Sequence, residues 1–238
     1  FSVKAFAAWA PGLETKNAWV AWANGKVAII GTREPSVKNM PPILRRRAGF
    51  AAKMALEVAY QCVGTRTDVP SVFSSRHGEA ARSADLLLAL AKNDPLSPTS
   101  FGLSVHNATA GLFSIARGDH ANSAAVAAGK SSVESAVIEA CGLLAEGEPE
   151  VMLVAYDCPL PTVYADFQDC VEQPYAWAWL MRAATDDFYS LCWSTGNESS
   201  HDQHLPGGLE ILRFYLRGDA LLNRTCDRRS WQWMHSAA

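Results

Sequence analysis

Short hydrophobic runs and longer stretches with helical spacing follow one another along most of the chain. The runs have the length of strands and lie at residues 1–9, 27–30, 69–75, 121–128 and 151–156. Apolar residues at every third or fourth position predict helices at about 44–63, 78–93, 104–118 and 133–145, with a proline-rich loop at 94–100. Strands that alternate with helices predict an α/β fold in layers.

The last third of the chain continues with two more candidate strands, at residues 174–183 and 187–195, and a helix at about 206–217. Two pairs of tryptophans are spaced two residues apart, the spacing that places side chains on one face of a strand, so we expect them to pack a sheet or a partner. They are Trp177 with Trp179 and Trp231 with Trp233. No internal repeat or linker is visible, which favours a single domain over residues 1–238.

Charge and composition narrow the possible partners. The formal net charge of −3 gives no global attraction to nucleic acid or to anionic lipid. No run of eighteen apolar residues and no signal-peptide layout is present, so we expect a soluble, cytoplasmic protein without a membrane span. The six cysteines are never closer than twelve residues. This spacing gives no C-x-x-C motif, and we expect free thiols and no metal or cofactor.

Three histidines invite a chemical interpretation. His201 and His204 have the H-x-x-H spacing of metal ligands, but they fall in a Ser/Asn/Gly-rich stretch without a third ligand, so we expect a loop there and no metal site. His106 precedes a half-apolar helix, a position typical of a hydrogen-bonded core or interface histidine.

The stretch Ser123–Val133 contains "GKSS" where a strand is predicted to turn into a helix. A phosphate-binding P-loop would need a glycine where Ala124 stands, so a plain turn is the favoured interpretation. Enzymes of the α/β class often mount a nucleophilic Cys or Ser at such an elbow, because the helix N-terminus stabilises negative charge.

The region that begins with "SPTSFGLSVHNATAG" and continues from "VAAGKSSVESA" to "EVMLVAYD" resembles the β-ketoacyl synthase family of the thiolase fold. In that family an N-x-x-A-G helix, a short strand, a T-A-C-[ST]-[ST] elbow, a buried helix and an apolar strand follow in this order. With the family's spacing, counted from Gly111 or from Val151, the reactive cysteine falls on Lys130. The family's two histidine motifs have no counterpart, and the chain has about half a member's length. The resemblance implies a three-layer α/β protein with the N-terminal half of the thiolase fold.

A chain of this kind is similar to the short ketosynthase-like N-terminal proteins of aryl polyene gene clusters, which are treated as chain length factors. The resemblance implies a catalytically inactive subunit, with Lys130 at the degenerate nucleophile position. Such a subunit would form a heterodimer with an active β-ketoacyl-ACP synthase and shape its acyl tunnel in polyene- or fatty-acid-type chain elongation. The subunit would contact acyl carrier protein through that heterodimer.

The resemblance also implies roles for individual residues. The strand before the elbow would pair across the dimer axis, and its neighbourhood supplies the expected interface residues Asn122, Ser123, Ala124, Ala125, Val126 and Asn107. Thr99, Ser100 and Phe101 would form the floor of the partner's acyl tunnel. Arg45, Arg46 and Arg47 open the predicted long helix, where they either meet an acidic carrier protein or form a solvated face.

Two other functions stay open at this point. A stand-alone acyltransferase would use Lys130 as a desolvated amine nucleophile, or a cysteine such as Cys158. A P-loop nucleotide binder would use the Gly129–Lys130 turn.

Overall fold

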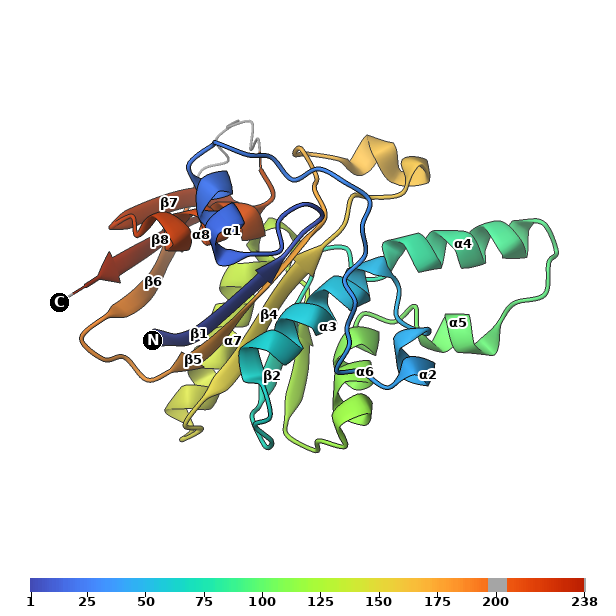
Figure 1. The fold of residues 1–238 in the computed structure, drawn as a ribbon. Coiled ribbons are helices and arrows are strands. Elements are labelled where there is room, and N and C mark those ends of the chain that lie inside the picture. Colours follow the sequence, from blue (N-terminus) through green and yellow to red (C-terminus); the bar gives the residue numbers. More distant parts are fainter. Residues whose placement is uncertain (197–204, 238) are drawn as a thin grey trace.

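The computed structural model describes residues 1–196 and 205–237. Its centre is a five-stranded sheet, drawn in Figure 1. The strands are ordered β1 (Ser2–Trp9), β5 (Tyr175–Arg182), β4 (Val151–Asp157), β2 (Ser71–Ser74) and β3 (Ser123–Val126). β2 is parallel to both β3 and β4, whereas β5 is antiparallel to β1 and β4. β3 and β1 are therefore the two edge strands.

Helices cover both faces of this sheet (Figure 1). On one face lie α3 (Phe50–Val63) and α6 (Ala108–Arg117), and on the other lie α7 (Ser132–Ala145), α1 (Lys16–Ala23) and α8 (Gly207–Arg217). The three-layer α/β prediction is confirmed.

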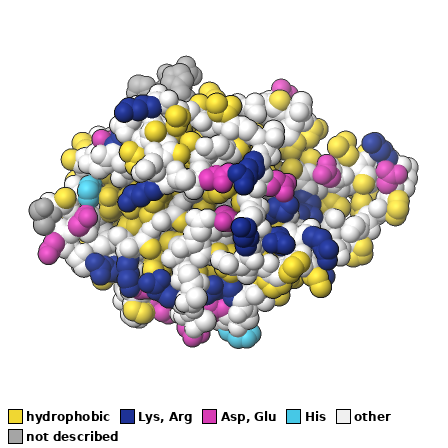
Figure 2. Space-filling model, viewed as in Figure 1, with side chains coloured by type: hydrophobic (Ala, Val, Ile, Leu, Met, Phe, Trp, Pro, Cys, Tyr) yellow, Lys and Arg dark blue, Asp and Glu magenta, His cyan; other side chains and the backbone are white. Residues whose placement is uncertain are grey.

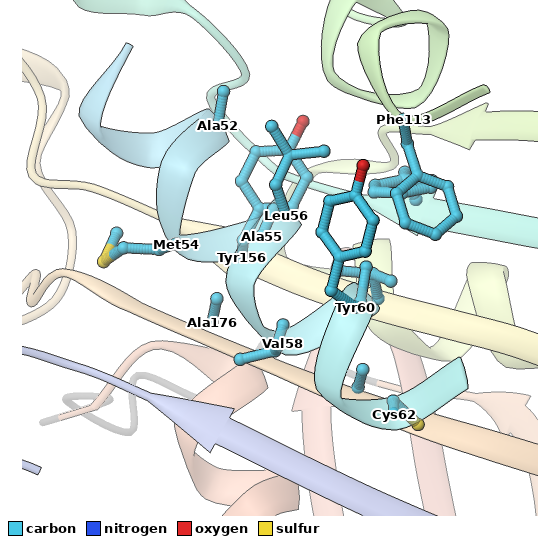
Figure 3. Packing of buried hydrophobic residues seen from close by; sticks show 14 of the residues in the cluster. Ala52, Met54, Ala55, Leu56, Val58, Tyr60, Cys62, Phe113, Tyr156 and Ala176 are labelled. Carbon is cyan, nitrogen blue, oxygen red and sulfur yellow. The ribbon is translucent and has the colours of Figure 1, made fainter. Parts of the chain in front are cut away.

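The core under α3 is built from small and medium-sized side chains. Met54, Ala55, Leu56 and Val58 are fully buried against the sheet, and small residues let the helix axis approach the strands closely (Figure 3). Tyr60 meets Phe113 of α6 edge to face, with ring centroids 5.3 Å apart. The apolar spacing that predicted this helix thus corresponds to a nearly enclosed element.

The opposite core is aromatic. Trp177 and Trp179 of β5 are fully buried with ring centroids 4.5 Å apart, and Trp177 Nε1 donates to Gly208 O at 3.0 Å. Trp231 and Trp233 lie buried on β8 (Arg229–Ser236), the middle strand of a second sheet with β6 (Phe188–Thr195) and β7 (Leu221–Cys226). The expectation that both tryptophan pairs pack a sheet is confirmed.

An arm projects from the body beside the sheet (Figure 1). It consists of α4 (Ala80–Ala91) and the short α5 (Pro98–Gly102). Two further short elements are α2 (Pro42–Arg45) and η2 (Thr162–Phe167). The expected loop at 94–100 thus ends in the first residues of a helix, whose N-cap is Ser97.

The N-terminal region departs most from the sequence prediction. The predicted strand at 27–30 is wrong: this segment pairs with no strand of the described chain, and Ile30 is 74% exposed. The helix α1 was missed, although Trp19, Trp22 and Ala23 have helical spacing and Thr15 caps it. The predicted helix at 44–63 is two helices, because the chain is extended at Gly49, the N-cap of α3.

The histidines of the H-x-x-H pair, His201 and His204, lie outside the described residues. Within residues 1–196 and 205–237, no three His, Cys, Asp or Glu side chains are grouped to hold a metal ion. No described helix is long and apolar enough to cross a bilayer.

Candidate functional site

The strand-to-helix elbow predicted at Gly129–Lys130 is present at the carboxyl end of the sheet. β3 ends at Val126, one turn of 3₁₀ helix covers Gly129–Ser131, and α7 begins at Ser132. Gly129 has a φ of +57°, a conformation that favours glycine at this turn. The Ser132 hydroxyl accepts from Ala128 N at 3.0 Å and donates to Gly129 O at 2.7 Å, which fixes the bend.

The Lys130 amine is ion-paired within the chain. Its Nζ lies 3.2 Å from Asp169 Oδ2. The same carboxylate accepts two hydrogen bonds from the Arg76 guanidinium, at 2.7 and 2.8 Å. These bonds from Arg76, with a smaller contribution from Lys130, lower the pKa of Asp169 to about 2. Lys130, which the resemblance places at the nucleophile position, is therefore part of a three-residue ion cluster with Asp169 and Arg76.

A second carboxylate ties together the ends of two neighbouring strands. Asp157, at the end of β4, accepts from Ser75 Oγ at 2.7 Å and from the backbone N–H groups of Arg76 and His77, both at 3.0 Å. Burial raises the pKa of this carboxyl, and the three hydrogen bonds oppose that rise. These bonds fix the segment that carries Arg76 to the end of β4.

The loop after β4 covers the segment that carries Arg76 and His77. Glu172 accepts from Leu160 N at 2.7 Å, and its other oxygen lies 2.9 Å from His77 Nε2. The cavity that remains between Lys130, Asp157 and this loop has a volume of about 40 Å³. Such a space holds one or a few water molecules and is far too small for an acyl chain.

The anion-binding position at the N-terminus of α7 is occupied by the chain itself. Asp227 Oδ2 accepts from Ser131 N and from Ser131 Oγ, both at 3.2 Å. Asp227 and Arg228 form the tight turn between β7 and β8, and Trp231 Nε1 of that hairpin also donates to Ser131 Oγ at 3.0 Å. A carboxylate thus sits where a phosphate or oxyanion would be bound.

A buried charge network joins the β7–β8 hairpin to α7 and α8. Glu134, in the first turn of α7, pairs with Arg224 of β7, whose Nε also donates to Glu210 of α8 at 2.6 Å. Burial lowers the pKa of Arg224, but the two carboxylates outweigh it and raise the pKa overall. Three elements are locked together through one guanidinium.

Two thiols line the small cavity, but neither is activated. Burial, followed by Asp157, raises the pKa of Cys158 well above that of a free thiol. Burial, followed by the charge of Asp169, raises the pKa of Cys170 to about 11. The thiolate is the nucleophilic form, so both thiols are poorly suited to attack a thioester at neutral pH.

The residues expected at a dimer interface lie at one edge of the molecule. β3 is an edge strand whose inner side pairs with β2, and Asn122 and Ser123 are exposed. Ala124, Ala125 and Val126 are partly exposed, and Asn107 is the exposed N-cap of α6. As expected for a hydrogen-bonded histidine, His106 Nε2 lies 2.8 Å from Ser75 O.

The other predicted residues lie on or near the arm. Thr99 and Phe101 are exposed, with Phe101 at 67%, whereas Ser100 lines a cavity of about 690 Å³ beside α4. The expected position of the three arginines was wrong: α3 begins at Phe50, so they precede the long helix instead of opening it. Arg45 ends α2 and donates to Ser36 O at 3.2 Å, while Arg46 and Arg47 are exposed.

Several polar residues at the elbow were missed from the sequence. Asp169, Arg76 and Asp227 are far apart along the chain and carry no local pattern that links them. Glu134 gave one usable signal, because a charged residue among the apolar positions of a buried helix requires a partner.

The comparison with known families fits this geometry. The profile described as "Beta-ketoacyl synthase, N-terminal domain" matches residues 19–234. The chain belongs to this family. No curated protein matches the sequence.

Solved structures agree on the fold of this β-ketoacyl synthase domain. A ketosynthase in complex with its chain length factor from Xenorhabdus doucetiae contains a chain 27% identical to it, with a TM-score of 0.82 and 98% of each chain covered. The ishigamide ketosynthase/chain length factor shares 11% identity, with a TM-score of 0.75 and coverage of 99% and 98%.

Comparison with a modular ketosynthase shows how much of a larger ketosynthase chain this chain covers. The ketosynthase from module 1 of the bacillaene synthase of Bacillus amyloliquefaciens has 13% identity and a TM-score of 0.59. The alignment covers 84% of this chain but 46% of that one. The predicted resemblance to half of a thiolase-like ketosynthase is confirmed.

Proposed function

We propose that this chain is a catalytically inactive, chain-length-factor-like subunit that pairs with an active β-ketoacyl-ACP synthase and shapes its acyl tunnel. The elbow carries this proposal: Lys130, ion-paired to Asp169 at 3.2 Å, stands where the family resemblance places the reactive cysteine. An amine in an ion pair offers no thiol for thioester exchange, so the acyl chain must be held by another protein. The match to a ketosynthase–chain length factor complex over 98% of both chains supports this role.

The free edge of β3 is the proposed pairing surface. Ser71 N and Ser75 N of the β2 segment donate to Asn122 O and Val126 O, so the backbone groups of the alternate residues Ser123 and Ala125 face away from the sheet. An unpaired edge is a ready template for a strand from another chain. The small side chains of this strand allow a close approach.

Two further surfaces complete the proposal. Thr99, Ser100 and Phe101 on α5 would form the floor of the partner's tunnel, because the arm projects toward open space (Figure 1). Arg45 ends α2, and Arg46 and Arg47 follow it. Lys and Arg side chains gather on this part of the surface (Figure 2), which would suit an acidic carrier protein.

We also propose the setting in which this subunit works. Residues 1–238 would act as a single domain, because Arg224 of the second sheet pairs with Glu134 of α7, a helix packed on the main sheet. The subunit would work in the cytoplasm. The chain needs no cofactor of its own for the proposed role. Polyene- or fatty-acid-type elongation would be the reaction of the complex.

Co-expression tests the proposal directly. The chain is produced with a ketosynthase encoded next to it, and the mass of the purified species is measured by light scattering. We expect a one-to-one heterodimer that extends acyl chains from malonyl-carrier protein. Intact mass spectrometry of the isolated chain, incubated with acyl- and malonyl-carrier protein, should show no adduct. Two separate monomers, or a covalent adduct on this chain, would refute the proposal.

The structure offers physical arguments against the two other functions, a stand-alone acyltransferase and a P-loop nucleotide binder. A stand-alone acyltransferase would need a free amine at Lys130 or a reactive thiol at Cys158, yet one is ion-paired and the other has a raised pKa. A nucleotide would have to displace Asp227 from the start of α7. Thermal stabilisation by ATP with magnesium would revive the nucleotide-binding function.

A further inference from the structure

The apolar run at residues 27–30, which forms no strand, lies on the surface next to α1. Val27 is 45% exposed and Ile30 is 74% exposed, whereas Ile29 between them packs against the core. A Cβ atom on Gly12 would lie 2.5 Å from Ile30 O, so the backbone at Ile30 is packed tightly against the turn that precedes α1. The side chain of Ile30 is therefore held outward. Val20, on α1 itself, is also exposed.

Four basic side chains lie around the same helix, and none of them has a carboxylate oxygen within 4 Å in residues 1–196 and 205–237. They are Lys16 at the start of α1, Lys26 just after its end, and Arg213 and Arg217 of α8. Arg213 lies over the Trp22 ring at 5.2 Å, and Arg217 Nε donates to Ala23 O at 2.8 Å. Both arginines are thus fixed against α1. We call these four residues, with Val20, Val27 and Ile30, the α1 surface.

Acidic side chains offset little of the charge on the α1 surface. Glu14 pairs with Arg33 at 3.1 Å, and Glu210 pairs with the buried Arg224 at 2.6 Å. Asp219, which follows α8, is exposed and offsets part of the charge. The surface is therefore locally positive, although the whole chain has a formal charge of −3. Salt screens charges beyond about 8 Å at physiological ionic strength, so a ligand at this surface responds mainly to the local charge.

Basic and aliphatic side chains that lie next to one another are typical of proteins that bind the surface of an anionic bilayer. The basic groups attract the headgroups, and the aliphatic side chains enter the boundary between headgroups and acyl chains. Single-stranded nucleic acid suits this surface less well, because its bases stack on exposed aromatic rings, and Trp19 and Trp22 of α1 are buried.

We propose that the α1 surface binds a bilayer that contains anionic phospholipid, with Val27 and Ile30 entering the interface of that bilayer. α1 contacts β1, which is the opposite edge strand of the sheet from β3, and it lies on the side of the molecule away from the arm (Figure 1). The α1 surface therefore stays free when β3 pairs with another chain. This inference does not depend on the proposed function.

Flotation with lipid vesicles tests the inference. The chain is mixed with vesicles of phosphatidylcholine alone, or of phosphatidylcholine with about one-third phosphatidylglycerol, and the bound fraction is measured against lipid concentration. We expect binding to the anionic vesicles only, and a loss of most of it when salt is raised from about 0.1 M to about 1 M. Lys16→Gln combined with Lys26→Gln should weaken this binding by about thirtyfold, because each basic residue contributes about fivefold. Ile30→Ser should weaken it a few-fold.

Two matched controls keep the test specific. Lys38→Gln combined with Lys92→Gln removes the same charge from exposed positions elsewhere, and Ile43→Ser removes an aliphatic side chain that is exposed on α2. We expect both control variants to bind as the unmodified chain does. Equal binding to the two kinds of vesicle, binding to neither, or equal losses in the controls would overturn the inference. Binding of acyl carrier protein through Lys16 and Lys26, with the vesicles left unbound, would overturn it too and assign the surface to an acidic protein.

Discussion

The elbow at Gly129–Lys130 and the arm of α4 and α5 differ in whether their side chains have partners within the chain. At the elbow, Lys130 and Arg76 pair with Asp169, and Asp227 occupies the helix N-terminus, so the chain satisfies its own charges. On α4, α5 and the adjoining segment, large apolar side chains face solvent. Those more than two-fifths exposed include Leu87, Leu88, Leu90, Leu96, Phe101 and Val105.

The difference indicates which region needs a second protein. Soluble monomers rarely expose large contiguous apolar patches, so the arm has the character of an interaction surface. The elbow has the opposite character, since Lys130, Asp169 and Asp227 already have partners within the chain and its cavity is only about 40 Å³. The elbow is therefore a closed structural cluster, and the exposed apolar surface lies on the arm.

The largest effect should come from breaking the buried charges beneath the elbow. Arg224→Ala removes the guanidinium between Glu134 and Glu210 and leaves a fully buried carboxylate without its counter-ion. We expect a loss of about 3–5 kcal/mol in the free energy of unfolding. Urea unfolding followed by tryptophan fluorescence measures this loss.

An exposed ion pair provides the control for that substitution. Arg33 pairs with Glu14 at 3.1 Å, and its side chain is 75% exposed. Arg33→Ala should therefore cost less than about 1 kcal/mol. Equal losses for the two arginine variants would contradict the view that the elbow is stabilised by its buried charges.

The next effect tests the edge of the sheet. Ala125→Pro removes a backbone N–H that faces away from β2, and proline is tolerated on edge strands. We expect the Kd of the heterodimer to rise at least tenfold, or about 1.4 kcal/mol, while the isolated chain keeps its circular dichroism spectrum. Ala125→Ser, which keeps the N–H, should bind normally. An unchanged Kd for the proline variant would place the interface elsewhere.

The elements around the elbow could be predicted because each depends on a short stretch of neighbouring residues. The apolar face of 133–145, the strand at 151–156 and the turn at Gly129–Lys130 each depend on a short stretch of sequence, and the structure contains all three. The edge position of β3 followed from family resemblance alone. Strand order depends on contacts between distant segments that periodicity does not encode.

The parts that sequence analysis missed depend on long-range contacts or on packing. Asp169 reaches Arg76 across 93 residues, and Asp227 reaches Ser131 across 96, so no local pattern joins them. The run at 27–30 has the composition of a strand, but no strand of the described chain lies beside it. Apolar composition alone therefore could not decide whether that segment pairs.

A smaller effect should appear at acid pH. The folded-state pKa of Asp169 is about 2, below the unfolded value near 3.9, so its ion pairs stabilise the fold above about pH 4 and this contribution is lost as the pH falls toward 2. The carboxylate is partly exposed, which reduces the contribution to about 1 kcal/mol. Asp169→Asn should lower the urea midpoint at pH 6 and bring it closer to the wild-type value at pH 3. A constant difference between the two proteins at both pH values would argue against this ion cluster.

The smallest effect concerns the elbow itself. Lys130→Cys puts a thiol at the position that the resemblance assigns to the nucleophile. It also removes the positive charge that pairs with Asp169, and Asp227 stays bonded to the neighbouring Ser131, so negative charge near the thiol disfavours the thiolate. We expect no acyl adduct by intact mass. We also expect a thiol pKa at or above 8.5, read from the pH dependence of iodoacetamide labelling at this cysteine by peptide mass. Adding Asp227→Asn removes one negative charge from the start of α7 and should speed labelling at pH 7 a few-fold, which corresponds to less than about 1 kcal/mol. Rapid acylation of Lys130→Cys alone would show that a single substitution separates this elbow from an active one, and that the ion pairs around it are not what keeps it inert.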